Sequence, residues 1–428
     1  MSTTAKICSW LESLNIKHVV LFLLALGIVT RLTALAVLRI HPTIAFAEME
    51  KIARSLAENG TFANPYKIPT GPTAHHAPIY PMLLSVIFRA FGYGAAAAYA
   101  MAVMNIFFAA LHYALIPVLT DVAKIHRVVG VLAGFVAALV PYLIMREIRW
   151  ETTLSALAII LVILVATRWW QDPQPTRFHT FCLGLAWGGG MLCCPALLPV
   201  FLLILLYFGV FAWKRKHPRW LITVAIAALG MVVAIAPWTI RNYRALGGLV
   251  FVRSNFGLEV DLSNNSEAHA TFADNIAIGF PNNYYHLNHP WASRAHAEMV
   301  LQLGEIQYNR QYLHKGINWI RSNPRAFAKL ALQRVVFFWF MPTEAQPLKA
   351  FFLVPWTLLA IYGLWLALHR HRPLGTLLLC LWIAYPLVYY LLQTDTRYRY
   401  TVDWSFTLLA VYVLTKRLWD AGRPPAHR

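Results

Sequence analysis

Long apolar runs constrain this chain more than any other feature of its sequence. Val19–Leu38 and Leu221–Trp238 each carry at most one charged residue and are about as long as a helix that crosses a bilayer. The composition agrees, because 59% of the 428 residues are hydrophobic and 13% are charged, whereas about a quarter of a soluble domain is charged. The sequence therefore predicts an all-α polytopic membrane protein and excludes a soluble enzyme.

Basic residues set the expected orientation in the membrane. Lys and Arg number 37 against 18 Asp and Glu, which gives a net charge of +19. Such an excess is typical of cytoplasmic loops in membrane proteins, so it indicates contact with membrane lipids and no nucleic-acid partner. We place the N-terminus in the cytoplasm, together with the basic connectors Lys124–Arg127, Arg168–Arg177, Lys214–Arg219, His369–Arg372 and the tail from Lys416.

About ten spans satisfy this charge pattern with both chain ends in the cytoplasm. They are expected near 17–38, 95–119, 128–145, 152–168, 178–194, 196–213, 221–238, 351–368, 374–392 and 401–416. Two shorter apolar segments, Pro78–Phe91 and Phe327–Phe340, each contain an arginine and are expected to form interfacial helices in the outer loops. The outward-facing pieces are then 39–94, 146–151, 239–350 and 393–400.

This topology divides the chain into three parts. Residues 1–238 form an N-terminal transmembrane module whose first outer loop (39–94) carries the candidate catalytic acid. Residues 239–350 form an outer helical segment, and residues 351–428 form the C-terminal transmembrane helices. Most acidic residues outside the cytoplasmic loops fall in the outer pieces, so we expect the chemistry on the non-cytoplasmic face.

The first outer loop carries two candidate catalytic carboxylates. Apolar residues at Ile52 and Leu56 predict a helix with one apolar face, and Glu48 lies at its N-terminal end. The helix dipole favours an ionised carboxylate there, which suits a general base near neutral pH. Glu50 is the second candidate, and the alternative is that Glu48 only caps an interfacial helix.

A loop rich in proline and glycine follows and contains His75, His76 and Tyr80. Such a rigid loop is suited to line a substrate pocket. Adjacent histidines point in different directions, and no third ligand follows them at a defined spacing, so we predict polar loop histidines and no metal site. The sequence indicates no cofactor; a divalent metal is compatible with it but has no specific signal.

The short outer connector 145–151 places Arg146, Glu147, Arg149 and Glu151 between two spans. Charges so close to the hydrocarbon layer are costly and tend to be functional. Arginine matches phosphate oxygens with two parallel hydrogen bonds, so Arg149 or Arg146 is a candidate phosphate clamp. The alternative is that these four charges pair with one another at the interface.

An ordered set of motifs resembles the membrane glycosyltransferases of the GT-C superfamily. The resemblance is to the bacterial branch that looks like glycosyltransferase family 39, which includes protein O-mannosyltransferases and lipid A aminoarabinose transferases. The motifs are an acidic residue before Ile52-Ala-Arg-Ser-Leu-Ala, Gly71-Pro-Thr-Ala with Pro78-Ile-Tyr-Pro, Trp150-Glu151, Pro237-Trp-Thr-Ile-Arg-Asn-Tyr, Arg253-Ser-Asn-Phe-Gly-Leu-Glu with Asn264-Asn265, Gly304-Glu305 with Tyr308, and Arg397-Tyr-Arg-Tyr.

The resemblance implies a sugar donor carried on polyprenyl phosphate and an acidic residue of the first outer loop that activates the acceptor. By position that residue is Glu48, with Glu50 second, and the implied stereochemical outcome is inversion. The implied donor-phosphate residues are Arg149, Arg146, Arg397 and Arg399. The implied substrate-binding residues are His75, His76, Tyr80, Glu151, Arg253, Asn255 and Glu259.

We therefore expect a glycosyltransferase of a bacterial inner membrane that transfers a sugar from a polyprenyl-phosphate donor to a glycan, lipid or protein acceptor at the periplasmic face. Two alternatives remain. An O-antigen-ligase-like transferase would depend on an outer Arg/His pair instead of Glu48. A lipid-linked sugar flippase or transporter would need polar residues near the middle of the membrane, where the sequence has few.

Overall fold

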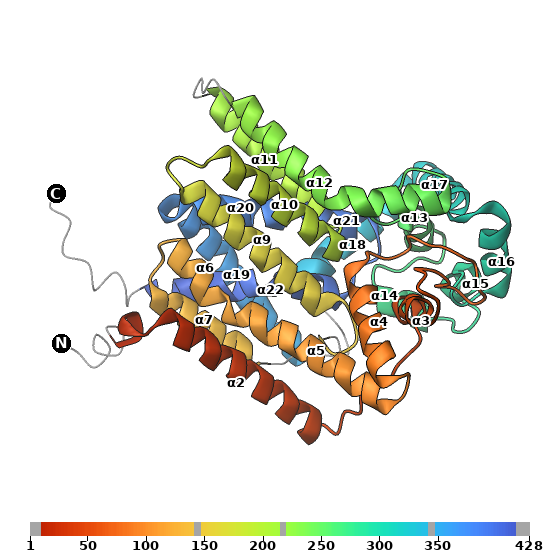
Figure 1. Ribbon diagram of the computed structural model, residues 1–428, viewed down its shortest axis with the longest axis horizontal. Coiled ribbons are helices and arrows are strands. Elements are labelled where there is room, and N and C mark those ends of the chain that lie inside the picture. The colour runs from red at the N-terminus through yellow and green to blue at the C-terminus, as the bar shows by residue number, and fades with distance from the viewer. Residues whose placement is uncertain (1–9, 141–146, 215–219, 341–346, 417–428) are drawn as a thin grey trace.

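The protein is described by a computed structural model that covers residues 10–140, 147–214, 220–340 and 347–416 (Figure 1). The regular structure of these residues is helical, with two isolated β-bridges between extended segments. The helices of the bundle are α2 (Ile16–Val37), α5 (Ala95–Ala114), α6 (Ile116–Val122), α7 (Arg127–Leu139), α9 (Thr152–Gln171), α10 (Arg177–Cys193), α11 (Leu197–Lys214), α12 (Trp220–Leu246), α19 (Pro347–Arg370), α20 (Arg372–Ala384), α21 (Leu387–Leu391) and α22 (Thr396–Leu414).

Within the described residues, each of the ten expected spans corresponds to one helix or to two consecutive helices, and the end of the span expected near 128–145 lies outside those residues. Two are interrupted near a proline, since α6 begins just before Pro117 and α21 just after Pro386. In the part of the chain that the structure describes, six helical segments are long and apolar enough to cross a membrane: Ile16–Val37, Ala95–Val122, Thr152–Gln171, Leu221–Leu246, Leu353–Arg370 and Arg372–Leu391. The predicted all-α, multi-helix membrane architecture is confirmed.

Further helices gather at one end of the bundle (Figure 1). They are α3 (Glu48–Asn59), α4 (Ile79–Phe91), α13 (Phe256–Ser263), α14 (Phe272–Ala277), α15 (Tyr284–Asn288), α16 (Arg294–Leu303), α17 (Glu305–Ser322) and α18 (Pro324–Phe340). Helices α4 and α18 correspond to the two short segments expected at the outer interface. The first outer loop and the segment 239–350 thus meet at the same end of the molecule.

Helix α12 continues beyond the expected span and ends at Leu246. The division placed after residue 238 therefore falls inside a helix. The extra turns are polar, and Arg241 in them donates hydrogen bonds to the carbonyl oxygens of Thr73 and Phe62 in the first outer loop, each at 2.6 Å. The helix continues because these polar side chains bind another part of the protein at the outer end of the bundle.

Small residues allow α10 and α12 to approach closely. A Cβ atom on Gly184 would collide with the carbonyl group of Ala227, and one on Gly230 would collide with the carbonyl oxygen of Phe181. Glycine at such crossings allows tight backbone contact between membrane helices. This packing supports α12 and, with it, the Arg241 side chain at its outer end.

Among the described residues, one buried ion pair joins α2 to Glu147 in the connector that follows α7, and another lies within α22. The guanidinium of Arg31 donates to both carboxylate oxygens of Glu147, with a shortest distance of 2.9 Å, and Tyr400 donates to the same carboxylate at 2.8 Å. The pair between Arg399 and Asp403 is also 2.9 Å long. Glu147 therefore pairs with a distant helix, so the expected pairing within the connector 145–151 is wrong for this residue.

Candidate active site

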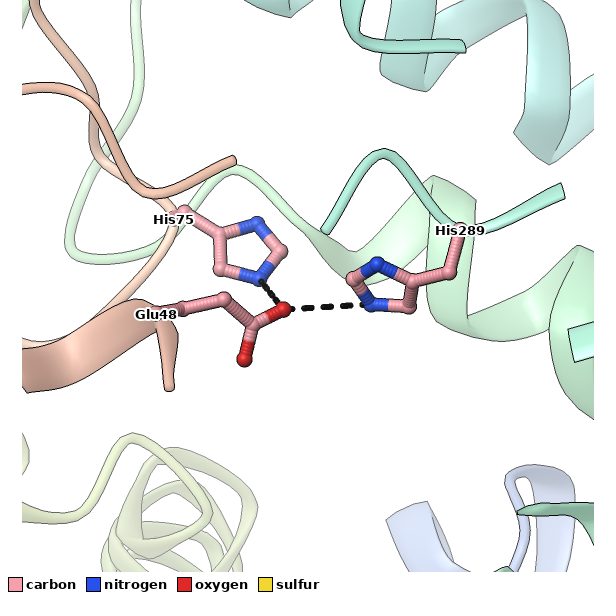
Figure 2. A group of neighbouring side chains, drawn as sticks. All are labelled: Glu48, His75 and His289. Carbon is pink, nitrogen blue, oxygen red and sulfur yellow. Dashed lines mark ion pairs between the residues drawn. The ribbon is translucent and has the colours of Figure 1, made fainter. Parts of the chain in front are cut away.

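Glu48 is the first residue of α3, and its carboxylate faces three imidazole rings. Its Oε1 atom lies 3.3 Å from Nε2 of His75 and 3.2 Å from Nε2 of His289, as Figure 2 shows, and its Oε2 atom lies 3.6 Å from Nε2 of His76. The Glu48 side chain is 17% exposed, and the three histidines are buried. The rings come from two outer segments that are far apart in the sequence.

The carboxylate carries the charge of this cluster. Burial acts to raise the pKa of Glu48, but the attraction of His289 and the close contacts with His75 and His76 outweigh burial and hold that pKa well below its usual range. Burial lowers the pKa of His76 to about 3 and also lowers the pKa of His289. Near neutral pH an ionised Glu48 therefore lies against neutral His76 and His289 rings.

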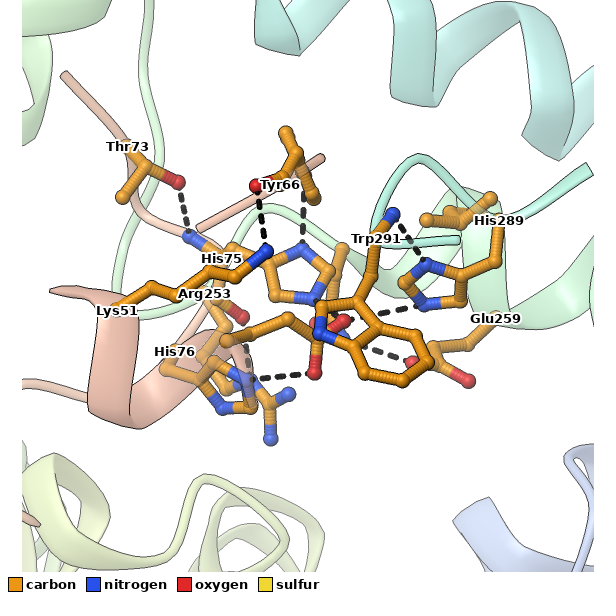
Figure 3. A network of polar contacts seen from close by, with 12 residues as sticks. Lys51, Tyr66, Thr73, His75, His76, Arg253, Glu259, His289 and Trp291 are labelled. Carbon is orange, nitrogen blue, oxygen red and sulfur yellow. Dashed lines mark hydrogen bonds and ion pairs between the residues drawn. The ribbon is translucent and has the colours of Figure 1, made fainter. Parts of the chain in front are cut away.

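Hydrogen bonds on the far side of the His75 and His289 rings orient these two histidines (Figure 3). The backbone N–H of Trp291 donates to Nδ1 of His289 at 3.1 Å, so Nε2 of that neutral ring carries the proton that points at Glu48. The Nδ1 atom of His75 lies 2.9 Å from the hydroxyl oxygen of Tyr66. These contacts fix which nitrogen faces the carboxylate.

A second buried carboxylate, Glu305, holds the histidine loop in place. It is the first residue of α17, and it accepts hydrogen bonds from the Thr73 hydroxyl, from the Ala74 backbone N–H at 2.8 Å, and from the Ser254 hydroxyl at 2.6 Å. Thr73 in turn accepts the backbone N–H of His75 at 3.0 Å. The position of the two loop histidines thus depends on a residue of the outer segment.

The two carboxylates of the first outer loop have different environments. Glu50 turns away from the histidines and accepts the backbone N–H of Ala47 at 2.9 Å, which caps α3. Its side chain is buried, and burial raises its pKa. The capping role that the sequence allowed for Glu48 therefore belongs to Glu50, and Glu48 remains as the carboxylate that faces the histidine cluster.

The candidate phosphate-binding arginines differ in burial and in their hydrogen-bond partners. Arg399 is buried and donates to Asp403, to the Thr357 hydroxyl and to the Trp339 carbonyl, so its donor groups already have protein partners. Arg149 is exposed, with one long contact of 3.4 Å to the Thr43 hydroxyl. Arg146 lies outside the described residues.

Arg253 and Arg397 lie nearer to the histidine cluster. The Nε atom of Arg253 donates to the His75 carbonyl at 3.0 Å (Figure 3). The guanidinium of Arg397 lies 4.4 Å from the Trp150 ring centroid and 5.0 Å from that of Phe272, and its Nε atom has no hydrogen-bond partner among the described residues. Both arginines keep donor groups that a phosphate oxygen can use.

Asn255 and Glu259 also belong to this region, whereas Tyr80 does not contact it. Asn255 precedes α13 and donates to Glu259 at 3.1 Å, and Glu259 lies beside His289 in Figure 3. The hydroxyl of Tyr80 accepts from Asn105 at 2.8 Å inside an apolar cluster, so its expected substrate contact has no support in this geometry. Glu151 precedes α9, and its Oε2 atom is buried without a hydrogen-bond partner in the described part of the chain.

His289, Glu305 and Tyr66 are site residues that sequence reasoning missed. Glu305 stood in one of the quoted motifs but had no assigned role. His289 follows Glu48 by more than half of the chain, so no local spacing rule connects the two residues. The high content of His, Asn and Tyr in the outer segment was the only sequence signal for it.

The cluster has the donor set of a metal site. One oxygen of Glu48 and one nitrogen each of His75 and His289 lie within 4.8 Å of one another, and two histidines with one carboxylate are a common ligand set for zinc. The prediction of no metal site rested on the absence of a third ligand, which His289 supplies. A metal at its Nε2 requires the proton to move to Nδ1, where the Trp291 N–H now donates.

Two features of the described residues are relevant to a comparison with known proteins, the helical bundle and the carboxylate at one end of it. A bundle of membrane-type helices carries outer loops at one end, and the first of them presents an ionised carboxylate among basic and aromatic groups. The chain has a fold similar to that of two solved archaeal oligosaccharyltransferases, in agreement with the predicted GT-C-like architecture.

Two solved structures show this likeness. The Archaeoglobus fulgidus oligosaccharyltransferase in complex with Zn and sulfate aligns with a TM-score of 0.52 and 13% identity, over 94% of this chain and 49% of that protein. The archaeal oligosaccharyltransferase AglB from Archaeoglobus fulgidus, in complex with an inhibitory peptide and a dolichol-phosphate, aligns with a TM-score of 0.55 and 14% identity, over 96% of this chain and 52% of that one. The chain thus spans about half of their length. The sequence matches no protein-family model and no curated protein.

Proposed function

We propose that this protein is a membrane glycosyltransferase that moves a sugar from a polyprenyl-phosphate donor to an acceptor on the outer, periplasmic face of a bacterial inner membrane. The observation that carries the proposal is the ionised Glu48 carboxylate, oriented by three histidines at the outer end of a GT-C bundle. The AglB structure that contains a dolichol-phosphate supports a lipid-phosphate donor. The motifs that resemble family 39 support the bacterial branch.

The proposed reaction is a single displacement. The acceptor hydroxyl oxygen forms a bond to the anomeric carbon while the bond from that carbon to the phosphate oxygen breaks. The polyprenyl phosphate leaves with the electron pair, and the hydroxyl proton passes to Glu48. One displacement inverts the anomeric configuration. Because the pKa of Glu48 is low, the proton moves late, after the attacking oxygen has begun to bond and has become acidic.

Cationic groups would stabilise the leaving phosphate. Arg253 is our first candidate because its Nε atom already bonds the His75 carbonyl beside Glu48. Arg397 is the second, with Trp150 and Phe272 against its guanidinium, and the exposed Arg149 is the third. A fixed guanidinium near the departing oxygen stabilises the charge that grows there in the transition state.

We also propose that Glu48, His75 and His289 hold a divalent metal ion, as their donor types and spacing allow. Such an ion would supply positive charge for an acceptor or phosphate oxygen. Elemental analysis of purified protein after incubation with Zn²⁺ and desalting tests this. We expect about one ion per chain, lost in His75→Ala and in His289→Ala, with the fold unchanged by circular dichroism. No retained metal in the unmodified protein would contradict it.

The function as a whole is tested in cells. Intact-mass analysis of envelope glycans, lipids and glycoproteins compares a strain that lacks the protein with strains that carry the unmodified chain, Glu48→Gln, or the control Glu58→Gln. Glu58 is exposed on the same helix, where it pairs with Arg54. We expect one sugar modification to be restored by the unmodified chain and by Glu58→Gln only. Restoration by Glu48→Gln would contradict the assignment.

A further inference from the structure

A pocket lies on the outer part of the molecule, away from the Glu48 cluster. Its volume is about 410 Å³, which is within the usual size of small-molecule sites. The walls are the loop between α13 and α14, the end of α17, and one side of α18. The residues used below are Asn265, His269, Asp274, Trp319, Lys329 and Gln333.

One wall of this pocket separates it from the reaction centre. Phe272 belongs to the same segment as His269 and Asp274, but its ring packs against Tyr285, with the centroids 5.7 Å apart, and against the Arg397 guanidinium. Tyr285 in turn lies 5.0 Å from His289. The segment therefore has the pocket on one side and the neighbours of Glu48 on the other, and the pocket contains none of the catalytic candidates.

The wall is held rigidly before any ligand binds. The backbone N–H of Phe272 donates to the Thr394 carbonyl at 2.8 Å, and the N–H of Thr394 donates to the Ala270 carbonyl at 2.9 Å. The Asn275 side chain donates to Gln393 at 2.8 Å. A pre-formed wall lowers the entropy cost of binding, as expected for a built site.

Several polar groups in the pocket have no protein partner. The indole N–H of Trp319, the Lys329 ammonium, the Gln333 amide and the His269 ring make no hydrogen bond within the described residues. Together they supply donors, acceptors and an aromatic face. The positive charge of Lys329 is matched by the negative charge of Asp274, so the lining is close to neutral.

From this chemistry we infer that the pocket binds a neutral sugar unit of a glycan, apart from the sugar that reacts. A sugar presents hydroxyl groups, which both donate and accept, to the amide and imidazole groups, and an apolar face to the Trp319 ring. A phosphate or another anion would lie beside Asp274 without a net positive charge to hold it. The ligand class is therefore a neutral hexose or N-acetylhexosamine.

The test is saturation-transfer NMR on the full chain in lipid nanodiscs. The probes are methyl glycosides of glucose, galactose, mannose and N-acetylglucosamine at millimolar concentration, with inorganic phosphate and glycerol phosphate as competitors. We expect saturation of at least one glycoside, reduced at least fivefold in Trp319→Ala and in Gln333→Leu. Gln302→Leu, at an exposed glutamine of α16 outside the pocket, is the matched control and should leave the signal unchanged.

The result also separates this site from the proposed reaction centre. Glu48→Gln should abolish transfer and leave this signal intact, so failure of the proposed function and failure of the pocket are distinguishable. Absence of saturation for every glycoside would overturn the inference. So would a signal that Glu48→Gln removes while Trp319→Ala and Gln333→Leu do not, and so would displacement by phosphate, which would make the pocket an anion site.

Discussion

Glu48 and Glu50, two residues apart on α3, have opposite electrostatic environments. Glu48 faces histidine side chains that favour its ionised form, whereas Glu50 is buried and accepts backbone N–H groups at the start of α3. We predict that Glu48→Gln lowers the rate of transfer by roughly 10²–10⁴, the usual cost of losing a general base. Glu50→Gln should keep transfer, because the Gln amide oxygen can still accept the Ala47 N–H. Rates of the two purified variants in one assay check this, and equal losses would contradict the division of roles.

The buried Glu50 also gives a prediction about pH. Its pKa is raised above the ordinary value of 4.5 in the folded protein, so burial of its charged form costs stability. A raised carboxyl pKa makes folding relatively more favourable at low pH, and that advantage is lost as pH rises through the folded pKa. Glu50→Gln removes this cost. Its melting temperature should match that of the unmodified protein at pH 4 and exceed it at pH 8. A difference in melting temperature between the two proteins that does not change with pH would contradict this account.

The position of the histidine loop depends on hydrogen bonds between the first outer loop and α17. Glu305 bonds Thr73, Ala74 and Ser254, yet it does not touch the Glu48 carboxylate. We predict that Glu305→Ala leaves the helical content unchanged but lowers transfer about 10- to 100-fold, because His75 and His76 lose their fixed positions. Glu305→Asp should retain only part of the transfer activity, since the aspartate side chain is one methylene shorter than that of glutamate.

A readout independent of turnover separates positioning from general destabilisation in Glu305→Ala. Hydrogen exchange at residues 70–76 should increase, while exchange in α9 and α22 stays unchanged. Glu298→Ala, at an exposed carboxylate of α16 that pairs with Arg294, is the matched control and should alter neither. Faster exchange throughout the bundle would indicate a purely structural role for Glu305.

The arginines of the outer loops and of α22 should separate into binding and structural groups. Arg253→Ala should weaken binding of a polyprenyl-phosphate sugar about 10- to 100-fold, since a hydrogen bond to a charged group contributes about 1.5–3 kcal/mol. Arg399→Ala should lower stability by about 3–5 kcal/mol, because it leaves Asp403 buried without its partner. Donor affinity and thermal stability, measured on both variants and on Arg149→Ala, check this. The largest affinity loss in Arg149→Ala would move the phosphate site to the connector 145–151.

For the whole molecule, the long apolar runs were sufficient to predict the helices of the bundle and their order, but not the separate short helices α13 to α16. Hydrocarbon-length runs leave a chain few alternatives to helix. The extension of α12 was missed because Arg241 and its neighbours look like a loop when their partners in the first outer loop are unknown. Local sequence patterns indicate only local structure, whereas Arg241 donates a hydrogen bond to a residue more than a hundred positions earlier in the chain.

The candidate site was predictable only in part for the same reason. The sequence suggested Glu48 from its place at a helix start and from a family resemblance, and His75 and His76 from their loop. The spacing could not tell Glu48 from Glu50, since both stand in the first turn of α3. His289 and Glu305 were missed because their roles exist only once the outer segment folds over the first loop. The sequence also does not reveal that Asp403 and Thr357 accept hydrogen bonds from Arg399.

The central claim is that this protein forms a glycosidic bond with Glu48 as the base. The most direct measurement uses proteoliposomes with radiolabelled hexosyl and pentosyl polyprenyl phosphates, and an envelope extract as the source of acceptor. Our account predicts a new labelled glycoside with the unmodified protein and with Glu58→Gln, and only background with Glu48→Gln. Movement of labelled lipid across the bilayer without a new glycoside, or full transfer by Glu48→Gln, would contradict it.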